Sequence, residues 1–332
     1  MKIFVTGGSG MIGSHSVERL VADGHEVHAL ARNEAGAELL ESIGARVVPG
    51  SVEDPSVWES LEGTDLILHA AAVLSRRATW SEFESVNVGA TRLMIGAAKR
   101  LGARIIHISS VAVYGRTGIR PITEEAPFGE LNEMDFYSRT KRLAEELLWD
   151  EAPRNGVRAV ALRPCFVYGE RDRLVVPRLV RAVRSPIIPI VGRGDNKLSM
   201  VYAGNVADAV RAAVQTPEAS GAFNVTNDGN LTQRELFQLI AEAAGRSIIT
   251  LRVPTRVASA AVQARSVLKF LITRHSRAGF ATNAVKFLAR ENPFSSERAY
   301  RELNWQPSTP PAEGLARAVR WFVASGGAGH TT

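Results

Sequence analysis

The sequence has a single cysteine, Cys165, among its 332 residues, which excludes an internal disulfide and fits a reducing compartment. No apolar run reaches the roughly 18 residues that a membrane-spanning helix needs. A strand-like apolar segment already starts at Lys2, so we expect no secretory signal ahead of it. The seven histidines show no metal-ligand spacing, and we predict no bound metal. Together these absences favour a cytoplasmic globular protein.

Acidic residues are missing from one long segment. Between Arg246 and Arg290 there are nine Lys and Arg and no Asp or Glu, although the whole chain is only +6. This basic segment is also apolar, which leaves two interpretations open. It forms a helical cap over a substrate pocket with a solvated basic face, or it also contacts an anionic membrane surface. No recognition motif accompanies the charge, so we predict no nucleic-acid partner.

Short apolar runs alternate with helical patterns through the first half of the chain. This alternation is typical of a parallel sheet with helices on both faces, whose strands are buried on both sides. Right-handed crossovers then give an α/β fold with a doubly wound parallel sheet, the Rossmann arrangement. The predicted strands are residues 2–5, 26–31, 46–48, 65–69 and 104–108, and the predicted helices include 11–23 and 91–100.

Three glycines follow the first predicted strand. Gly7 permits a tight turn, Gly10 lets the backbone approach a pyrophosphate, and Gly13 lets the next helix pack closely on the strand. The helix that starts at Met11 and Ile12 offers backbone amides to the phosphates. A glycine-rich loop without a ligand is the alternative, but the flanking strand and helix favour dinucleotide binding.

The residues at the end of the second predicted strand indicate which of the two nicotinamide cofactors, NAD(H) or NADP(H), is preferred. An NAD-binding protein usually offers a carboxylate to the ribose hydroxyls there, about 20 residues after the turn. Here Ala31 and Arg32 occupy that place, so the acid is missing and a guanidinium follows. A guanidinium suits the 2′-phosphate of NADP, which a carboxylate would repel. We therefore predict NADP(H) as the preferred cofactor, with NAD(H), and an Arg32 that is only solvated, as the alternatives.

Tyr137 and Lys141 lie four positions apart in a predicted helix and thus on one face of it. An adjacent ammonium lowers the pKa of a tyrosine from about 10, which makes Tyr137 a candidate general acid or base. With the glycine turn about 130 residues upstream, this pair resembles the extended short-chain dehydrogenase/reductase superfamily, also called the NAD-dependent epimerase/dehydratase superfamily. The resemblance implies hydride transfer to or from a nicotinamide, and a contact between Lys141 and the nicotinamide ribose.

Further segments resemble this superfamily over nearly the whole chain. Residues 108–115 resemble its fifth-strand motif, which makes Ser110 the catalytic hydroxyl and leaves its neighbour Ser109 as the alternative. Asn87 lies in a segment that resembles a helix start, where it steadies the site. Lone thiols can be redox sensors, but for Cys165 a buried packing role beside the cofactor is favoured. Besides the glycine turn, the resemblance implies cofactor contacts at Arg32, Val52, Ala70, Ala71, Ala72, Ser109, Tyr137, Lys141, Pro164, Cys165 and Val167.

The alternation of strands and helices changes after Pro164, where several prolines interrupt the pattern. We predict an NADP-binding Rossmann domain and a smaller, interleaved substrate-binding domain. The first comprises residues 1–164 and 199–226, and the second comprises 165–198 and 227–332. Within these ranges we predict a strand at 199–202 and helices at 205–215, 232–245 and 254–290.

The run 163–165 and the 254–290 segment resemble the branch of 3β-hydroxysteroid dehydrogenases and dihydroflavonol reductases. That branch implies an NADP(H)-dependent oxidoreductase acting on a largely apolar ketone or secondary alcohol. The alternative is a nucleotide-sugar epimerase, dehydratase or reductase, whose diphosphate would use Arg171, Arg173 or Arg193.

A non-catalytic NADP-binding regulator is a second alternative. The presence of Ser110, Tyr137 and Lys141 together argues against it, since a sensor without turnover needs no such set. Members of the resembled family often pair two helices, here 91–101 and 137–149, into a two-fold interface. The resemblance therefore implies a homodimer acting on a small-molecule substrate.

Overall fold

The computed structural model describes residues 1–75, 77–226, 231–258, 260 and 291–326. The chain divides into two compact units. The first comprises Met1–Val167, Ala203–Thr226 and Phe294–Thr309, and the second comprises Tyr168–Tyr202, Asn227–Pro293 and Pro310–Thr332. Every residue predicted to take part in catalysis or cofactor binding therefore belongs to the first unit.

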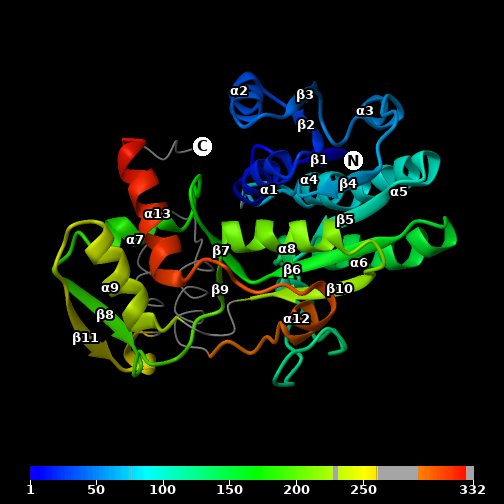
Figure 1. Ribbon diagram of the computed structural model, residues 1–332. Helices are drawn as coiled ribbons and strands as arrows, with labels where there is room; N and C mark the ends of the chain where they lie inside the picture. Colours follow the sequence, from blue (N-terminus) through cyan, green and yellow to red (C-terminus); the bar gives the residue numbers. More distant parts are fainter. Residues whose placement is uncertain (76, 227–230, 259, 261–290, 327–332) are drawn as a thin grey trace. The chain divides into compact units, whose positions relative to one another are not determined.

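A seven-stranded parallel sheet forms the centre of the first unit (Figure 1). Its strand order, β3-β2-β1-β4-β5-β6-β10, reverses direction between β1 and β4, so the predicted doubly wound Rossmann fold is confirmed. The strands are β1 (Lys2–Thr6), β2 (Glu26–Ala31), β3 (Arg46–Pro49), β4 (Leu66–His69), β5 (Arg104–Ile108), β6 (Ala159–Pro164) and β10 (Gly221–Val225).

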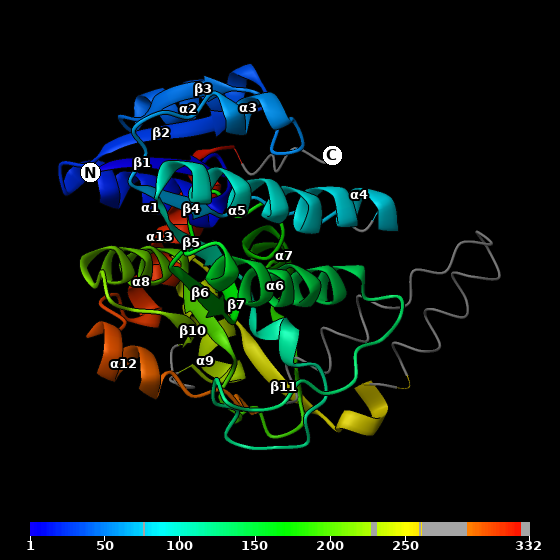
Figure 2. The same ribbon diagram turned by 90° about the vertical axis from the view of Figure 1, so that its right-hand side faces the viewer.

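Helices cover both faces of this sheet. On one face α1 (Met11–Ala22) contacts α8 (Ala203–Gln215), and on the other α5 (Ala90–Leu101) contacts α6 (Phe136–Arg154). Figure 2 shows α5 and α6 lying side by side. The other elements of the unit are α2 (Glu34–Ser42), α3 (Pro55–Glu59), α4 (Trp80–Glu84), a π-helical turn (Ser85–Gly89), a 3₁₀ turn (Val111–Tyr114) and α12 (Glu297–Leu303).

All five predicted strands are confirmed, and their ends differ from the prediction by at most one residue. β6 and β10 are additional strands that the sequence did not predict. Arg163 interrupts the apolar pattern of β6, and Asn224 interrupts that of β10. Both side chains are buried, and their hydrogen-bond partners, Glu145 and Tyr114, come from elsewhere in the chain. Local patterning therefore gave no strand signal at either place.

The second unit has an apolar core of its own. The helices α7 (Val176–Ala182), α9 (Gln233–Ala243) and α13 (Pro311–Ala324) contribute buried side chains to it. β8 (Ile187–Val191) and β11 (Ile249–Val253) form a parallel pair. β9 (Met200–Tyr202) confirms the strand predicted at 199–202, and α9 confirms the helix predicted at 232–245. β7 (Phe166–Tyr168) crosses the boundary between the two units.

The structure differs from the predicted domain boundaries in three places. Residues 165–167 belong to the first unit, residues 199–202 belong to the second, and the segment Phe294–Thr309 belongs to the first. Trp305 in this segment is buried and donates from Nε1 to the Asn205 carbonyl at 3.0 Å. The Asn205 side chain in turn bonds both backbone groups of Thr309, at 2.9 Å each. These contacts fix the segment to α8. That the two units divide cofactor binding from substrate binding stays a prediction.

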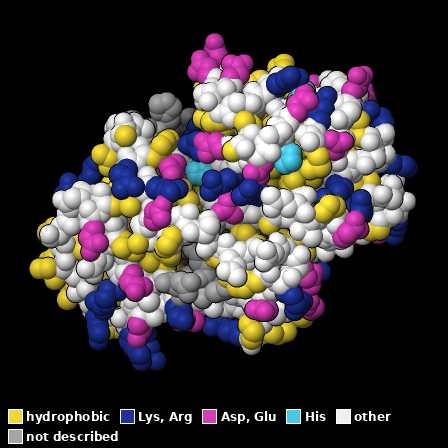
Figure 3. All heavy atoms as spheres, in the orientation of Figure 1, with side chains coloured by type: hydrophobic (Ala, Val, Ile, Leu, Met, Phe, Trp, Pro, Cys, Tyr) yellow, Lys and Arg dark blue, Asp and Glu magenta, His cyan; other side chains and the backbone are white. Residues whose placement is uncertain are grey.

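The basic segment 246–290 lies largely outside the described residues. The helix predicted at 254–290, with its pocket-cap and membrane interpretations, therefore stays a prediction. Among the residues that the structure describes, no helix is both long and apolar enough to cross a bilayer. On the face shown in Figure 3, Lys and Arg side chains are mixed with Asp and Glu rather than gathered into one basic region.

Candidate active site

Most of the predicted site residues follow the carboxyl ends of parallel strands. Gly7 follows β1, Arg32 follows β2, Ala70 follows β4, Ser109 follows β5 and Cys165 follows β6. Because these strands are parallel, their carboxyl ends share one edge of the sheet. Open parallel sheets bind ligands at this edge, next to the point where the strand order reverses.

The glycine turn leaves no space for side chains. Gly7 has a φ of +68°, and a Cβ there would lie 2.5 Å from the amide nitrogen of Ala71. A Cβ at Gly13 would lie 2.1 Å from the carbonyl oxygen of Gly7. α1 begins after Gly10 without a side-chain cap on its first amides. Such a helix start, behind a turn with close backbone contacts, fits the pyrophosphate of a dinucleotide.

The end of β2 carries no carboxylate. Ala31 is buried, and Arg32 beyond it is exposed. Asn33 caps α2, its side chain accepting from the Gly36 amide at 2.9 Å. Val52 is buried in the core near this edge, rather than exposed. Arg32 is thus an exposed cation directly after β2, and its contact with a cofactor phosphate stays a prediction.

The structure separates the two candidate serines. The Ser110 side chain lies close enough to the Tyr137 hydroxyl to lower its pKa, and it accepts from the Ala112 amide at 3.2 Å. The Ser109 hydroxyl is buried and donates to the Glu145 carboxylate on α6. Ser110 is therefore the serine beside Tyr137, whereas Ser109 faces the protein interior.

Lys141 lies one turn beyond Tyr137 on α6, and its ammonium donates to the Ile108 carbonyl at 2.6 Å. Burial lowers the pKa of Lys141 to about 8, and the Glu145 carboxylate opposes this change. Burial also raises the pKa of Tyr137, against a smaller opposite effect of the Ser110 hydrogen bond. The predicted lowering of the Tyr137 pKa is therefore wrong, because burial outweighs the groups that stabilise phenolate. Tyr137 keeps its proton at neutral pH and can donate it.

Asn87 lies in the π-helical turn before α5 and is almost fully buried. Its Oδ1 accepts from the Val73 amide at 2.9 Å, and its Nδ2 donates to the Thr140 hydroxyl at 2.9 Å. Thr140 precedes Lys141 on α6. Asn87 therefore fixes α6 to the loop after β4, which is a positioning contact rather than one with the reacting groups.

The remaining predicted cofactor contacts lie beside β1 and β10. Residues 70–72 are partly buried, and Ala70 and Ala71 lie directly against Gly7. Pro164 ends β6 opposite Val225 of β10. Cys165 is buried and not in a disulfide, its amide donates to the Val225 carbonyl at 3.2 Å, and Val167 is half-buried. Contact of these residues with a cofactor stays a prediction.

Residues 3–227 match the NAD dependent epimerase/dehydratase family. This range includes the glycine turn, Ser110, Tyr137 and Lys141. The chain belongs to this family. It is an NAD(P)-dependent oxidoreductase of the extended short-chain dehydrogenase/reductase type, as the resemblance implied.

Similarity to individual members of the family covers both units. The chain is 30% identical over 319 residues to a 4-hydroxy-2-methyl-3-oxo-4-farnesyl-3,4-dihydroquinoline-1-oxide ketoreductase from Stigmatella aurantiaca, over 95% of each chain. It is 28% identical over 331 residues to a 2-alkyl-3-oxoalkanoate reductase from Stenotrophomonas maltophilia, over 96% of this chain and 98% of the relative. The structure of UDP-glucose 4-epimerase from Thermotoga maritima with UDP-glucose aligns with a TM-score of 0.76 at 25% identity, over 98% of this chain and 99% of that one.

Sequence reasoning missed four buried ionisable residues of this family member. Glu145 and Arg163 form an ion pair between α6 and β6, and His69 and His107 are ring neighbours on β4 and β5. Glu145 lies two turns after Tyr137 on the same face of its helix, a spacing that could have indicated it. The histidines interrupt strands that are otherwise apolar and buried, and this interruption could have indicated them as candidate site residues.

The two histidine rings are stacked with centroids 5.5 Å apart, and His69 Nδ1 lies 2.7 Å from the Thr6 hydroxyl oxygen. Burial, with a smaller effect from Lys141, lowers the pKa of His69 to about 3 and that of His107 well below its usual value. Both rings are therefore neutral at physiological pH. They add polar surface near Lys141 without adding charge.

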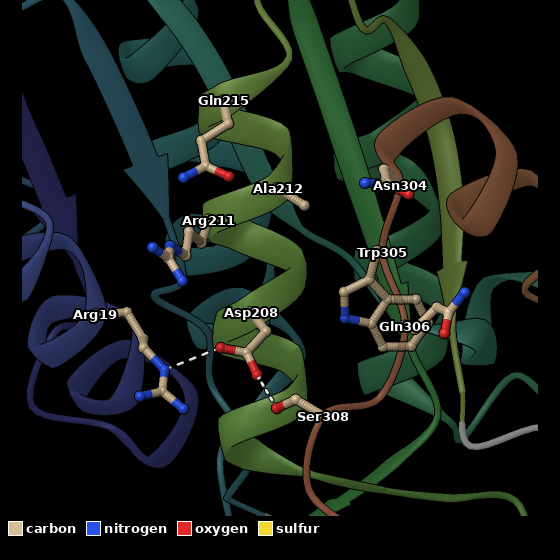
Figure 4. Close-up of a pocket in the computed structure, with 9 residues that line it drawn as sticks. All are labelled: Arg19, Asp208, Arg211, Ala212, Gln215, Asn304, Trp305, Gln306 and Ser308. Atoms are coloured by element: carbon tan, nitrogen blue, oxygen red, sulfur yellow. Dashed lines mark hydrogen bonds and ion pairs between the residues drawn. The ribbon is translucent and has the colours of Figure 1, made fainter.

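A surface pocket of about 360 Å³ in the first unit is not part of this site (Figure 4). It lies between α1, α8 and the segment that contains Trp305. Its Asp208 accepts from Arg19 at 2.9 Å and from the Ser308 hydroxyl at 2.6 Å, and none of its lining residues is a predicted site residue. These pairs connect α1 and the C-terminal segment to α8, so we interpret the pocket's polar groups as structural.

Proposed function

We propose that the protein is an NADP(H)-dependent oxidoreductase that transfers a hydride between the nicotinamide and a largely apolar ketone or secondary alcohol. Tyr137 acts as the general acid in reduction and as the general base in oxidation. The observation that carries the proposal is the closeness of the Ser110 side chain to the Tyr137 hydroxyl, whose pKa it lowers, with Lys141 one turn further along the same helix. This set lies at the sheet edge where the glycine turn would hold the dinucleotide.

Ser110, Tyr137 and Lys141 would have different roles in the proton transfer. Ser110 and Tyr137 both present hydroxyls, and a substrate carbonyl oxygen placed between them would accept two hydrogen bonds. Because burial keeps Tyr137 protonated, its hydroxyl can pass a proton to that oxygen as the ketone becomes an alcohol. The nicotinamide supplies or accepts the hydride when bound. Lys141 would hold the ribose hydroxyls with its ammonium, close enough to Tyr137 to favour transient phenolate.

The relatives support an apolar ketone as substrate. One is named for a 3-oxo compound that carries a farnesyl group, and another for 2-alkyl-3-oxoalkanoates. Both names describe a ketone next to a carbon with an apolar substituent. Incubation of the purified protein with NADPH and a panel of 2-alkyl-3-oxo esters and acids tests this class directly. Consumption of NADPH with matching alcohol formation is the expected result.

A nucleotide-sugar reaction is the second candidate, because the Thermotoga maritima epimerase structure contains UDP-glucose. In this chain Arg193, one of the cations predicted to bind a diphosphate, is exposed and already paired with Asp195 at 2.8 Å. That pairing gives the second candidate less support. Incubation with UDP- and dTDP-sugars, followed by chromatography of the sugars, separates the two candidates. Turnover of either substrate class excludes a regulator without activity.

Exchanging the residues at the end of β2 should reverse the cofactor preference. Arg32 would bind the 2′-phosphate with a charge-assisted contact of about 1.5–3 kcal/mol. The double change Ala31→Asp and Arg32→Asn should therefore weaken NADPH binding by about 10- to 100-fold and strengthen NADH binding. Fluorescence titration with both cofactors measures the change. An unmodified protein that binds NADH more tightly than NADPH would contradict the assignment.

The protein should form a homodimer through α5 and α6. Leu143 on α6 is 40% exposed, and Gly96 of α5 is exposed with open space where a Cβ would lie. A glycine inside a helix costs about 1 kcal/mol relative to alanine, which a closely packed partner helix would offset. Leu143→Glu should shift the mass in light scattering from dimer to monomer. Leu251→Glu, at an exposed leucine of β11, is the control and should leave the dimer mass unchanged.

A further inference from the structure

Three residues on one face of α6 hold three consecutive residues at the end of β5. Tyr137, Lys141 and Glu145 are spaced by one helical turn, and each contacts a different member of the segment 108–110. The Ser110 side chain, at the end of the segment, lies close enough to the Tyr137 hydroxyl to lower its pKa. The Lys141 ammonium donates to the carbonyl of Ile108, the first residue of the segment, at 2.6 Å. The Glu145 carboxylate accepts a hydrogen bond from the hydroxyl of Ser109, the middle residue of the segment. Glu145 thus continues the row that the two predicted catalytic residues begin.

The carboxylate of Glu145 is fully buried and held by several donors. Arg163, itself only 4% exposed, donates from Nε to both carboxylate oxygens, at 3.0 and 3.2 Å. Trp149, one turn further along α6, donates from Nε1 at 3.1 Å. The Ser109 hydroxyl adds a further donor. These donors fix the position of the carboxylate, and the Arg163 guanidinium forms an ion pair with it.

We propose that Glu145 is a positioning residue of the active site, which fixes the Ser109–Ser110 segment and supplies the negative charge opposite the Lys141 ammonium. The inference rests on the proposed function, in which Ser110 and Lys141 act on substrate and cofactor. Glu145 touches neither of them itself. It acts through its hydrogen bond to Ser109 and through its charge one turn from Lys141.

Among the ionisable groups described near Lys141, the Glu145 carboxylate supplies the opposite charge. His69 and His107 face it from β4 and β5, and both are neutral because burial lowers their pKa values. On α6 itself, Tyr137 is also neutral at physiological pH, since burial raises its pKa. Burial would remove the proton from Lys141, and the Glu145 carboxylate opposes that loss. Without this carboxylate, Lys141 would lose its charge closer to neutral pH.

A purely structural role for the Glu145–Arg163 pair makes a different prediction. Removing one member of a buried ion pair commonly costs about 3–5 kcal/mol of stability, whatever else the pair does. If stability were its whole role, a folded variant would leave the titration of Lys141 unchanged. The titration midpoint of Lys141 therefore separates positioning from simple stabilisation.

This midpoint can be measured directly, because the chain has only six lysines. Carbon-13 NMR of protein labelled at lysine, with Lys141→Ala to assign the signal, gives the titration without substrate or cofactor. The wild-type midpoint should lie near 8. Glu145→Gln should lower it by about one unit, the lower end of the shift that a nearby opposite charge produces. An unchanged midpoint in a folded Glu145→Gln protein overturns the proposal.

Two further variants serve as a control and as a substitute for a variant that does not fold. Glu146→Gln removes the same charge from the next, exposed residue of α6 and should leave the Lys141 midpoint unchanged. If Glu145→Gln does not fold, Glu145→Gln combined with Arg163→Met removes both members of the ion pair, so that no guanidinium is left buried without its carboxylate. Its Lys141 midpoint should fall in the same direction. A wild-type midpoint in this folded double variant also overturns the proposal.

The pH dependence of turnover provides the functional readout. Lys141 is charged below its pKa and loses its proton as the pH rises through it. The wild-type kcat/KM should therefore decline above about pH 8, and in Glu145→Gln the decline should begin at a lower pH. A one-unit fall leaves about fivefold less charged Lys141 at pH 8. If no ketone is reduced but Glu145→Gln lowers the Lys141 midpoint, only the proposed function fails. If turnover requires Tyr137 but Glu145→Gln leaves the Lys141 midpoint unchanged, only this inference fails.

Discussion

Tyr137→Phe is expected to lower kcat by about 10²- to 10⁴-fold while NADPH binding stays within about twofold of wild type. The change removes one hydroxyl, which is the proton donor, and leaves the ring that fills the site. Burial keeps this hydroxyl protonated, so its loss removes the acid rather than a minor species. Stopped-flow measurement of NADPH oxidation, together with a fluorescence titration of the cofactor, gives both quantities on the same protein.

Two neighbouring variants make the result specific to proton donation. Ser110→Ala removes the hydroxyl beside Tyr137 that would also bind the substrate oxygen, and should lower kcat while leaving NADPH binding intact. Lys141→Ala should impair both turnover and cofactor binding, because its ammonium serves the tyrosine and the ribose. A Tyr137→Phe protein with near wild-type kcat would show that another group donates the proton.

Gly13→Ala is expected to weaken NADPH binding by about 100-fold or more and to reduce the free energy of unfolding by about 1–3 kcal/mol. The new Cβ would lie 2.1 Å from the Gly7 carbonyl oxygen and 2.8 Å from the Gly8 Cα. These are backbone atoms, so no side-chain rotation relieves the overlap. The turn must move, and the amides at the start of α1 move with it.

The matched control is Gly96→Ala, at a helical glycine whose Cβ would meet no atom within 4 Å. It should leave NADPH affinity unchanged, because Gly96 lies in α5 and no atom near it belongs to the glycine turn. Cofactor titration and thermal unfolding of both variants make the comparison. Equal NADPH affinity in the two variants would contradict the close packing inferred for the glycine turn.

The sequence predicted the features that depend on local spacing. The first five strands have apolar runs with clear ends, and the glycines at 7, 10 and 13 mark a turn whose geometry only glycine allows. Tyr137 and Lys141 share a helix face because they are one turn apart. For the strands, the shared helix face and the contact of Gly13 with Gly7, the physical cause lies within about ten residues of chain, so a single sequence contains it.

The features that were missed or wrong depend on contacts between distant residues. Arg163 lies in β6 only because Glu145, from a different element, neutralises it. The segment Phe294–Thr309 joins the first unit through Asn205, far away in sequence. The Tyr137 pKa was predicted to fall because the lysine was considered alone. Burial, which depends on the whole fold, raises it.

The central claim is tested most directly by following the hydride itself. The purified protein is incubated with NADPH deuterated at the transferring position and with a 2-alkyl-3-oxo ester, and the product is examined by mass spectrometry. We predict an alcohol with one deuterium at the former carbonyl carbon, formed by the wild type and lost in Tyr137→Phe. NADPH that remains unconsumed with every ketone, while a UDP-sugar is epimerised without net cofactor use, would contradict the account.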